Sequence, residues 1–266
     1  IAERTDQMGA LSLQGPKSRA VLNRCCATPV DGIKFFRMAP NVLAGKPVTI
    51  SRTGYTGDLG YEIWMEAVDA LPVWDAIMAA GSDYGIAPCG ILAMDMARVE
   101  AGLFMLDVDY TAATHAWIPG QKSSPYEMGL GWTIALDKPG YFVGRRALER
   151  EAREGSAWKL VGLEIGWEGL EQLYAAVGLP PQIPAMAVRG SLPVLHDGKQ
   201  VGYASTSTWS PVLKKYIALV HLQRPFYEPG TRVSLEITVE HHRRHAQRGE
   251  RTGDEVCRCS RPDRAA

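Results

Sequence analysis

The sequence has no excess of charge of either sign, because 29 Lys and Arg residues balance 29 Asp and Glu residues over 266 positions. A balanced chain creates no long-range field that would attract nucleic acid or anionic lipid. It also has no uninterrupted apolar run of the roughly 20 residues that a bilayer-spanning helix needs. We therefore expect neither nucleic acid nor a membrane as a partner. Any anionic ligand must be held by local residues.

Cysteine is scarce and arranged in a way that excludes two common uses. Adjacent Cys25 and Cys26, a single Cys89, and the pair Cys257 and Cys259 fit neither a disulfide framework nor a zinc site. We interpret them as reduced thiols, which predicts a cytoplasmic location. The chain begins at Ile1 with neither an initiator Met nor the basic and apolar stretches of a signal peptide, so we interpret its start as a cut end.

The first part of the chain alternates between strand and helix patterns. The spacing predicts strands over 9–13, 47–52 and 61–66, and helices over 17–22, 69–80, 90–101 and 143–154. In the helix at 69–80, the apolar residues Leu71, Trp74, Ile77 and Met78 are expected to form the buried face. This order of elements indicates an α+β fold.

The pattern changes after Gly155 to short strands with tight turns. A favoured Asp197-Gly198 turn joins two of these strands. We predict an α+β chain with a first region at 1–155 and a small β-barrel domain at 156–240. Residues 241–266 are rich in arginine and contain no aromatic residue, so we expect a basic, solvated, disordered tail.

A glycine-rich loop at 54–60 precedes the most informative strand. Strand alternation places Tyr61 and Ile63 on one face, and Glu62 and Trp64 on the other. A carboxylate beside an aromatic ring can accept paired N–H donors from a flat heterocycle and offer it a stacking surface. The alternative interpretation is a solvated glutamate at the end of a hairpin.

The motif Gly54-Tyr55-Thr56-Gly57-x-x-Gly60-x-Glu62 resembles the signature loop of the glycine-cleavage T-protein (aminomethyltransferase) family. Further matching segments follow the family's order, at 13–16, 98–103, 129–133, 143–148 and 210–218. The resemblance implies three subdomains around a folate channel, the last being a barrel. It also implies that residues 1–155 form a folate-binding, aminomethyltransferase-like region that is incomplete at its N-terminus. It also implies tetrahydrofolate as cofactor, with Tyr55 and Glu62 against it, and transfer of an aminomethyl or methyl unit from an amine or methylated donor.

The chain departs from the family pattern at Met94, where glycine-cleavage enzymes have an arginine of the folate site. Arg98 lies one helical turn further and shares that face, so we expect it either to compensate or to form a surface pair with Asp95. Leu106 also stands where many members have tyrosine. These differences argue against strict glycine cleavage and favour a demethylase-like branch or another aminomethyltransferase-like branch.

Other positions leave two interpretations open. Trp132 lines the channel or belongs to the core, and Lys214 and Lys215 meet the folate glutamate tail or are simply exposed at a strand edge. The resemblance places the catalytic aspartate before Ile1, so no catalytic residue is assigned and we expect these 266 residues alone to be nearly inactive. Expected partners are a small-molecule one-carbon donor, and a carrier protein or a flavin amine oxidase.

The alternative function is a non-catalytic folate-binding module of the same fold. Relatives of that kind carry a Lys-Gly-Cys-Tyr-x-Gly-Gln loop, which this sequence lacks. Its glycine loop instead favours the transferase.

Overall fold

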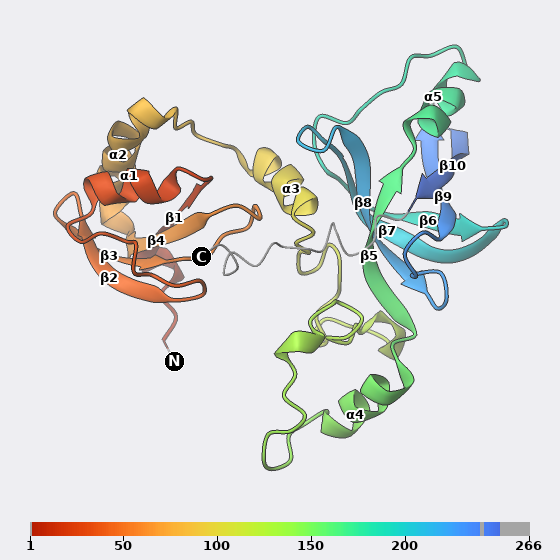
Figure 1. Ribbon diagram of the computed structural model, residues 1–266, viewed down its shortest axis with the longest axis horizontal. Helices are drawn as coiled ribbons and strands as arrows, with labels where there is room; N and C mark the ends of the chain where they lie inside the picture. Colours follow the sequence, from red (N-terminus) through yellow and green to blue (C-terminus); the bar gives the residue numbers. More distant parts are fainter. Residues whose placement is uncertain (1, 240–241, 251–266) are drawn as a thin grey trace. The chain divides into compact units, whose positions relative to one another are not determined.

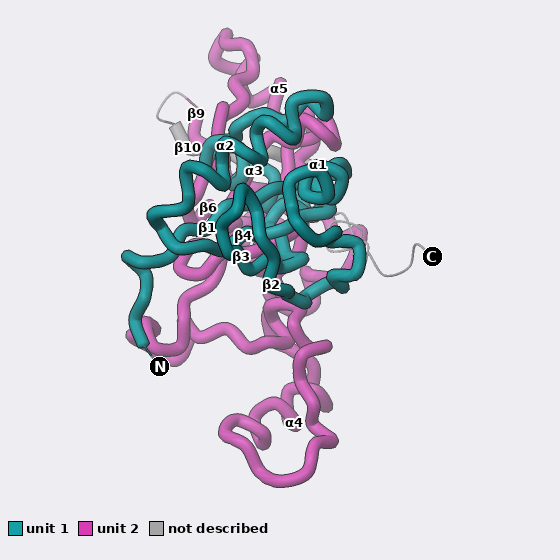
Figure 2. The backbone as a smooth tube through the Cα atoms, turned by 90° about the vertical axis from the view of Figure 1, so that its left-hand side faces the viewer, with its two compact units in different colours: residues 1–101, 259–266 teal, residues 102–258 magenta. Residues whose placement is uncertain are grey.

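The structure, a computed structural model, describes residues 2–239 and 242–250 (Figure 1). The described chain divides into two compact units, the first ending at Ala101 and the second beginning at Gly102 (Figure 2). No helix in the described part is long and apolar enough to cross a membrane.

The first unit is a four-stranded antiparallel sheet in the order β1-β4-β3-β2. Its strands are β1 (Met8–Gln14), β2 (Met38–Leu43), β3 (Lys46–Ser51) and β4 (Gly60–Glu66). Its α-helices are α1 (Ser18–Cys25), α2 (Ala70–Gly81) and α3 (Ile91–Glu100), with short 3-10 turns at Thr5–Gln7, Ala67–Asp69 and Ser82–Tyr84. The predicted strand–loop–strand arrangement around residues 54–60 is confirmed.

One face of this sheet carries the core of the first unit. Tyr61 and Ile63 of β4 are fully buried, as the alternation predicts, and pack in one cluster with Val21 of α1 and Ile77 of α2. Helices α1 and α2 therefore cover the face that carries the odd-numbered residues of β4. The even-numbered residues, including Glu62 and Trp64, lie on the opposite face.

The buried face of α2 differs from the one that the sequence predicts. Val73, Ile77 and Gly81 are buried, at the spacing of one face of a helix, whereas Leu71 is 68% exposed. Of the four predicted residues only Ile77 is buried, and Gly81 joins its face, where an added Cβ atom would lie 2.7 Å from Ile86 Cβ. Close packing through a glycine leaves no hydrophobic signal in the sequence.

The second unit begins with a largely irregular segment and ends in a barrel. The segment contains 3-10 turns at Pro119–Gln121 and Gly131–Thr133 and the helix α4 (Arg145–Glu154). The closed barrel follows the order β10-β5-β8-β7-β6-β9. Its elements are β5 (Trp158–Ile165), α5 (Trp167–Ala175), β6 (Val188–His196), β7 (Lys199–Ser210), β8 (Lys215–Gln223), β9 (Arg232–Val239) and β10 (His242–Glu250).

The predicted hairpin in the barrel is confirmed. Strands β6 and β7 pair across Asp197 and Gly198, whose positive φ angles of 48° and 76° match a turn with two left-handed residues. Leu163, Val220 and Leu235 are among the buried residues of the barrel core. The α+β class with a C-terminal barrel is thus confirmed.

The prediction of a disordered tail is wrong for His242–Glu250. These residues form β10, which pairs with β9 and β5 and closes the barrel. The reason is that backbone hydrogen bonds to two neighbouring strands do not require apolar side chains in the added strand. Residues 251–266 lie outside the described residues. The predicted boundary near Gly155 falls between α4 and β5, inside the second unit, and stays a prediction.

Candidate functional site

The glycine loop joins β3 to β4 and lies against the end of β1. The backbone N–H of Gly15 and the hydroxyl of Ser18 both donate to the Leu59 carbonyl, at 2.9 and 3.1 Å. Gly57 has a positive φ of 76°, which a residue with a side chain adopts only with strain. These contacts hold the loop beside the motif at residues 13–16.

Gln14 explains why the loop needs two of its glycines. A Cβ atom at Gly54 or Gly60 would lie 2.2 or 2.0 Å from Gln14 Oε1. The same oxygen accepts a hydrogen bond from Thr56 Oγ1 at 3.1 Å, and Gln14 Nε2 donates to Ser12 Oγ at 2.9 Å. The Gln14 amide therefore occupies the space that the missing side chains leave.

Glu62 lies half-buried on the sheet face that carries no core. Its Oε2 accepts hydrogen bonds from Thr53 Oγ1 at 2.7 Å and from Ser51 Oγ at 3.4 Å. Within residues 2–239, no hydrogen bond to Glu62 Oε1 is found. Two hydroxyls thus orient the carboxylate while one oxygen can accept from a ligand, so Glu62 is not a purely solvated hairpin residue.

The neighbouring aromatic residues lie as strand alternation predicts. Trp64 is two residues from Glu62 on the same face and is 40% exposed. Tyr55 is half-buried in the glycine loop. Thr53 and Ser51 were not predicted as part of the site, although both belong to the strand and loop that the motif identified. Ser51 pairs with Glu62 across β3 and β4, and Thr53 follows Ser51 by two residues, so a hairpin register would have placed both beside Glu62.

Arg98 and Asp95 form a buried ion pair, so the surface-pair interpretation is wrong. Arg98 Nε lies 2.9 Å from Asp95 Oδ1, and the two residues are 0% and 2% exposed. Sequence spacing cannot separate a buried pair from an exposed one, because both occur at i, i+3. Whether Arg98 contacts a cofactor stays a prediction.

Met94 lines an apolar cleft of about 550 Å³ in the first unit. The cleft is formed by the helix-covered side of the sheet, α2 and α3, and includes Leu13, Trp74 and Tyr84. Thr56 of the glycine loop also lines it, whereas Tyr55, Glu62, Trp64 and Arg98 do not. A charged side chain at position 94 would lose hydration in such surroundings, which makes methionine the compatible residue.

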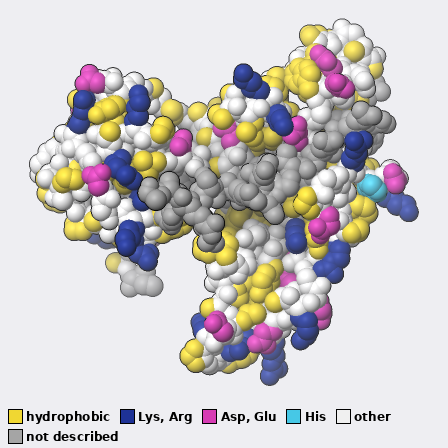
Figure 3. All heavy atoms as spheres, in the orientation of Figure 1, with side chains coloured by type: hydrophobic (Ala, Val, Ile, Leu, Met, Phe, Trp, Pro, Cys, Tyr) yellow, Lys and Arg dark blue, Asp and Glu magenta, His cyan; other side chains and the backbone are white. Residues whose placement is uncertain are grey.

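Trp132 lies on a 3-10 turn of the second unit and is 70% exposed, so the core interpretation is wrong. Hydrophobic side chains are visible on the surface around α4 (Figure 3), and Tyr141 and Val143 are also exposed there. Lys214 and Lys215 are exposed at the strand end, and Lys215 Nζ pairs with Glu164 Oε2 at 2.7 Å.

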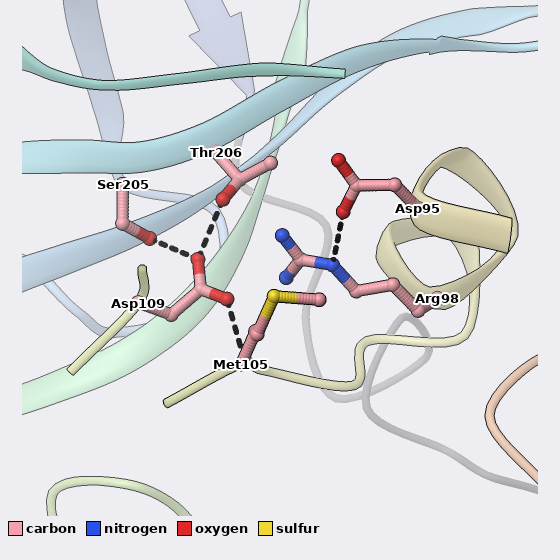
Figure 4. A network of polar contacts seen from close by, with 6 residues as sticks. All are labelled: Asp95, Arg98, Met105, Asp109, Ser205 and Thr206. Carbon is pink, nitrogen blue, oxygen red and sulfur yellow. Dashed lines mark hydrogen bonds and ion pairs between the residues drawn. The ribbon is translucent and has the colours of Figure 1, made fainter. Parts of the chain in front are cut away.

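A buried polar network in the second unit escaped the sequence analysis. Asp109 is 2% exposed and accepts hydrogen bonds from Ser205 Oγ at 2.6 Å, Thr206 Oγ1 at 2.7 Å and Met105 N at 2.7 Å (Figure 4). His221 Nε2 lies 2.6 Å from the Asp109 carbonyl, which makes it the donor. These bonds fasten the loop around Asp109 to β7 and β8.

Burial alters the proton affinities around this network. It lowers the pKa of His221, against an opposing effect of its hydrogen bond to Asp109, and so favours the neutral imidazole. Tyr203 stacks on His221 with ring centroids 4.8 Å apart, and burial raises the pKa of its hydroxyl. Burial also raises the pKa of Glu127, with Glu151 adding to the effect. Both shifts favour the neutral forms of His221 and Tyr203 near neutral pH.

The first unit with its glycine loop, together with the barrel of the second unit, defines a mixed α/β protein with a C-terminal barrel domain. Residues 1–138 match the model of the GCVT N-terminal domain, and residues 175–248 match that of the glycine cleavage T-protein C-terminal barrel domain. The chain belongs to the glycine cleavage T-protein family.

Relatives of known name agree with this assignment. An aminomethyltransferase of Halothermothrix orenii is 33% identical over 237 residues, which is 89% of this chain and 59% of that protein. A trimethylamine-oxide aldolase of Ruegeria pomeroyi is 36% identical over 254 residues, covering 92% of this chain and 29% of that protein. The chain thus spans little more than half the length of the aminomethyltransferase that it matches.

A solved structure supports the fold alone. The glycine cleavage system aminomethyltransferase T of Bartonella henselae superposes with a TM-score of 0.68 at 21% identity, covering 89% of this chain and 56% of that one.

Proposed function

We propose that this chain binds tetrahydrofolate and takes part in transferring a one-carbon unit to it from an amine or a methylated donor. The single observation that carries the proposal is the Glu62 carboxylate, which Thr53 and Ser51 orient through one oxygen while the other oxygen accepts nothing within residues 2–239. The names of its relatives support one-carbon transfer as the reaction class.

The residues present fit a pterin. An aminopyrimidinone edge carries adjacent N–H donors, and an ionised carboxylate is the strongest acceptor that a side chain offers them. Trp64 exposes part of its indole ring on the same sheet face, and Tyr55 lies in the adjoining loop. We propose these three residues as the cofactor-binding set in the first unit, and Arg98 and Trp132 as further candidates that the family resemblance suggests.

In this proposal Glu62 anchors the cofactor and is not the base. Tetrahydrofolate, when bound, supplies the nitrogen that accepts the carbon unit. The protein's contribution is to hold the acceptor in line with the donor carbon, and such positioning is a large part of catalysis of group transfer. Thr53 and Ser51 would then be positioning residues, because they act on the cofactor through Glu62.

Two classes of one-carbon donor agree with the named relatives. An aminomethyl donor agrees with the aminomethyltransferase relatives, and a methylated amine agrees with the trimethylamine-oxide aldolase relative. Met94 lines an apolar cleft and stands at the position where glycine-cleavage enzymes have arginine. This difference favours the demethylase-like alternative. A carrier protein or a flavin amine oxidase as partner, and a cytoplasmic location, belong to the same proposal.

Titration calorimetry with tetrahydrofolate tests the binding. We expect Glu62→Gln to weaken binding roughly ten- to a hundredfold, since a hydrogen bond to a charged group contributes about 1.5–3 kcal/mol. Glu66→Gln is the matched control, because Glu66 lies on the same strand face but is exposed and paired with Arg4. Equal affinities of the Glu62 variant and the unaltered chain would refute the assignment.

A transfer assay separates the enzyme from the non-catalytic folate-binding module. Two proteins are assayed side by side for methylation of tetrahydrofolate. One is the 266-residue chain, and the other is a longer version of it that has the length of its aminomethyltransferase relatives. Transfer by the longer protein, with little by the 266 residues, is the expected result. Binding without transfer by both proteins would favour the non-catalytic module.

A further inference from the structure

Two adjacent thiols lie together at the end of α1, on the helix-covered side of the first unit. Cys25 is the last residue of the helix and Cys26 is its C-cap, whose N–H donates to the Leu22 carbonyl at 2.8 Å. Both are free and half-buried, and both pack against the core cluster of the first unit. The proposed folate site does not use them.

The backbone directs both side chains toward the same core cluster from adjacent positions in the chain. Cys25 is helical, whereas Cys26 is extended, with φ −87° and ψ 145°, and pairs with Leu43 through an isolated bridge. The neighbouring Cys26 thiol lowers the pKa of Cys25, and Cys25 together with burial raises the pKa of Cys26. Cys25 Sγ also lies 3.4 Å from the Val21 carbonyl. The pair is therefore held between a helix and a strand.

A direct disulfide suits this pair poorly. Neighbouring Cα atoms across a trans peptide are about 3.8 Å apart, below the roughly 4.4–6.8 Å usual for disulfides. A single larger atom between the two sulfurs removes that constraint, because each sulfur then bonds to the atom and not to the other sulfur. An electrophile that takes two thiols at one atom fits the arrangement.

We propose that Cys25 and Cys26 form a two-thiol site for trivalent arsenicals. A monosubstituted arsenical, R–As(OH)2, reacts with both thiols: two As–O bonds break, two As–S bonds form, and the two thiol protons leave in two molecules of water. Arsenic stays trivalent, so no oxidant or reductant is needed. In the product the arsenic atom links Cys25, at the end of α1, to Cys26, which pairs with Leu43.

Phenylarsine oxide is the probe, added to the full 266-residue chain. The background carries Cys257→Ser and Cys259→Ser, because those thiols lie outside the described residues and would form a second pair. We expect one bound arsenic per chain by intact mass, with loss of two free thiols. A dithiol such as 2,3-dimercaptopropanol should release it, whereas a monothiol at the same concentration should not.

Single variants identify the ligands. Cys25→Ser and Cys26→Ser should each weaken binding at least roughly a hundredfold, which is the scale of losing the second of two linked contacts. Cys89→Ser is the matched control and should bind as the background does, because Cys89 stands alone among residues 2–239. Undiminished binding in either single variant, or no bound arsenic in the background, would overturn the proposal.

A second measurement leaves Cys25 and Cys26 unaltered, so its result cannot arise from a variant that fails to fold. In the background protein, phenylarsine oxide should block alkylation of Cys25 and Cys26 together, as read by peptide mass spectrometry, and leave Cys89 reactive. Protection of Cys89 alone would overturn the proposal.

Discussion

Replacing Asp109 with alanine should destabilise the second unit more than any exposed substitution in the same loop. The carboxylate accepts three short hydrogen bonds, from Ser205, Thr206 and the Met105 amide, while 2% exposed. Each bond to a charged group contributes about 1.5–3 kcal/mol, but such contributions are not additive within one network. Asp109→Ala would leave these buried donors without their acceptor, and one such unsatisfied donor costs about 1–3 kcal/mol, so we expect a total loss of about 3 kcal/mol.

Hydrogen exchange on peptides from β7 and β8 measures this effect where it arises. Asp109→Asn should lose less than Asp109→Ala, because its amide oxygen still accepts from the two hydroxyls while its nitrogen cannot accept from Met105 N–H. Asp107→Asn is the control, since the Asp107 side chain is 49% exposed and lies 3.0 Å from Nδ1 of the exposed His115. A loss below about 1 kcal/mol for Asp109→Ala would refute the view that this network fastens the loop to the barrel.

Two further predictions concern the barrel. Burial holds the pKa of His221 below its ordinary value of 6.5, so its stabilising effect is complete above that pH and is lost as pH falls through the folded-state pKa. As pH falls below 6.5, His221 should therefore lower the free energy of unfolding by at most about 1.4 kcal/mol per pH unit. Denaturant titrations at several pH values measure this dependence, and His221→Gln should make the free energy of unfolding depend less steeply on pH. An unchanged slope would contradict this. Gly202→Ala places a Cβ atom 2.0 Å from the His221 carbonyl oxygen, so we expect a loss of about 1–3 kcal/mol. Gly190→Ala, where no atom lies within 4 Å of the added Cβ, should cost less, and equal losses would contradict the steric account.

Local patterns predicted most of the strands, because their physical cause is local. Alternation in β4 placed Tyr61 and Ile63 in the core, and the Asp197-Gly198 pair predicted its hairpin through the φ angles that the turn requires. Strand β10 could not be predicted in this way. Its formation depends on two partner strands, and its own sequence lacks the apolar alternation of a half-buried strand.

The candidate site was predictable to the extent that its residues are close in sequence. Glu62, Trp64 and the glycine loop belong to one hairpin, so their shared face follows from strand geometry. Asp109 escaped because Ser205 and Thr206 lie 96 and 97 positions away, and nothing near Asp109 indicates that its carboxylate is buried. The burial of the Asp95–Arg98 pair could not be predicted for a related reason. The i, i+3 spacing indicates that the two side chains are in contact, but not whether they are exposed to solvent.

The relation between Gln14 and the glycines separates the loop's role in function from its role in stability. A methyl group at Gly60 would meet the end of a flexible side chain, so Gln14 could turn away at modest energetic cost. That movement would remove the hydrogen bond from Thr56, which holds the loop to β1, and the hydrogen bond to Ser12, which orients Gln14 within β1. The folded unit would persist while the loop beside Glu62 lost its fixed position. The glycines therefore matter chiefly because they let Gln14 fix the loop, and a ligand that depends on this loop should be more sensitive to them than is the fold.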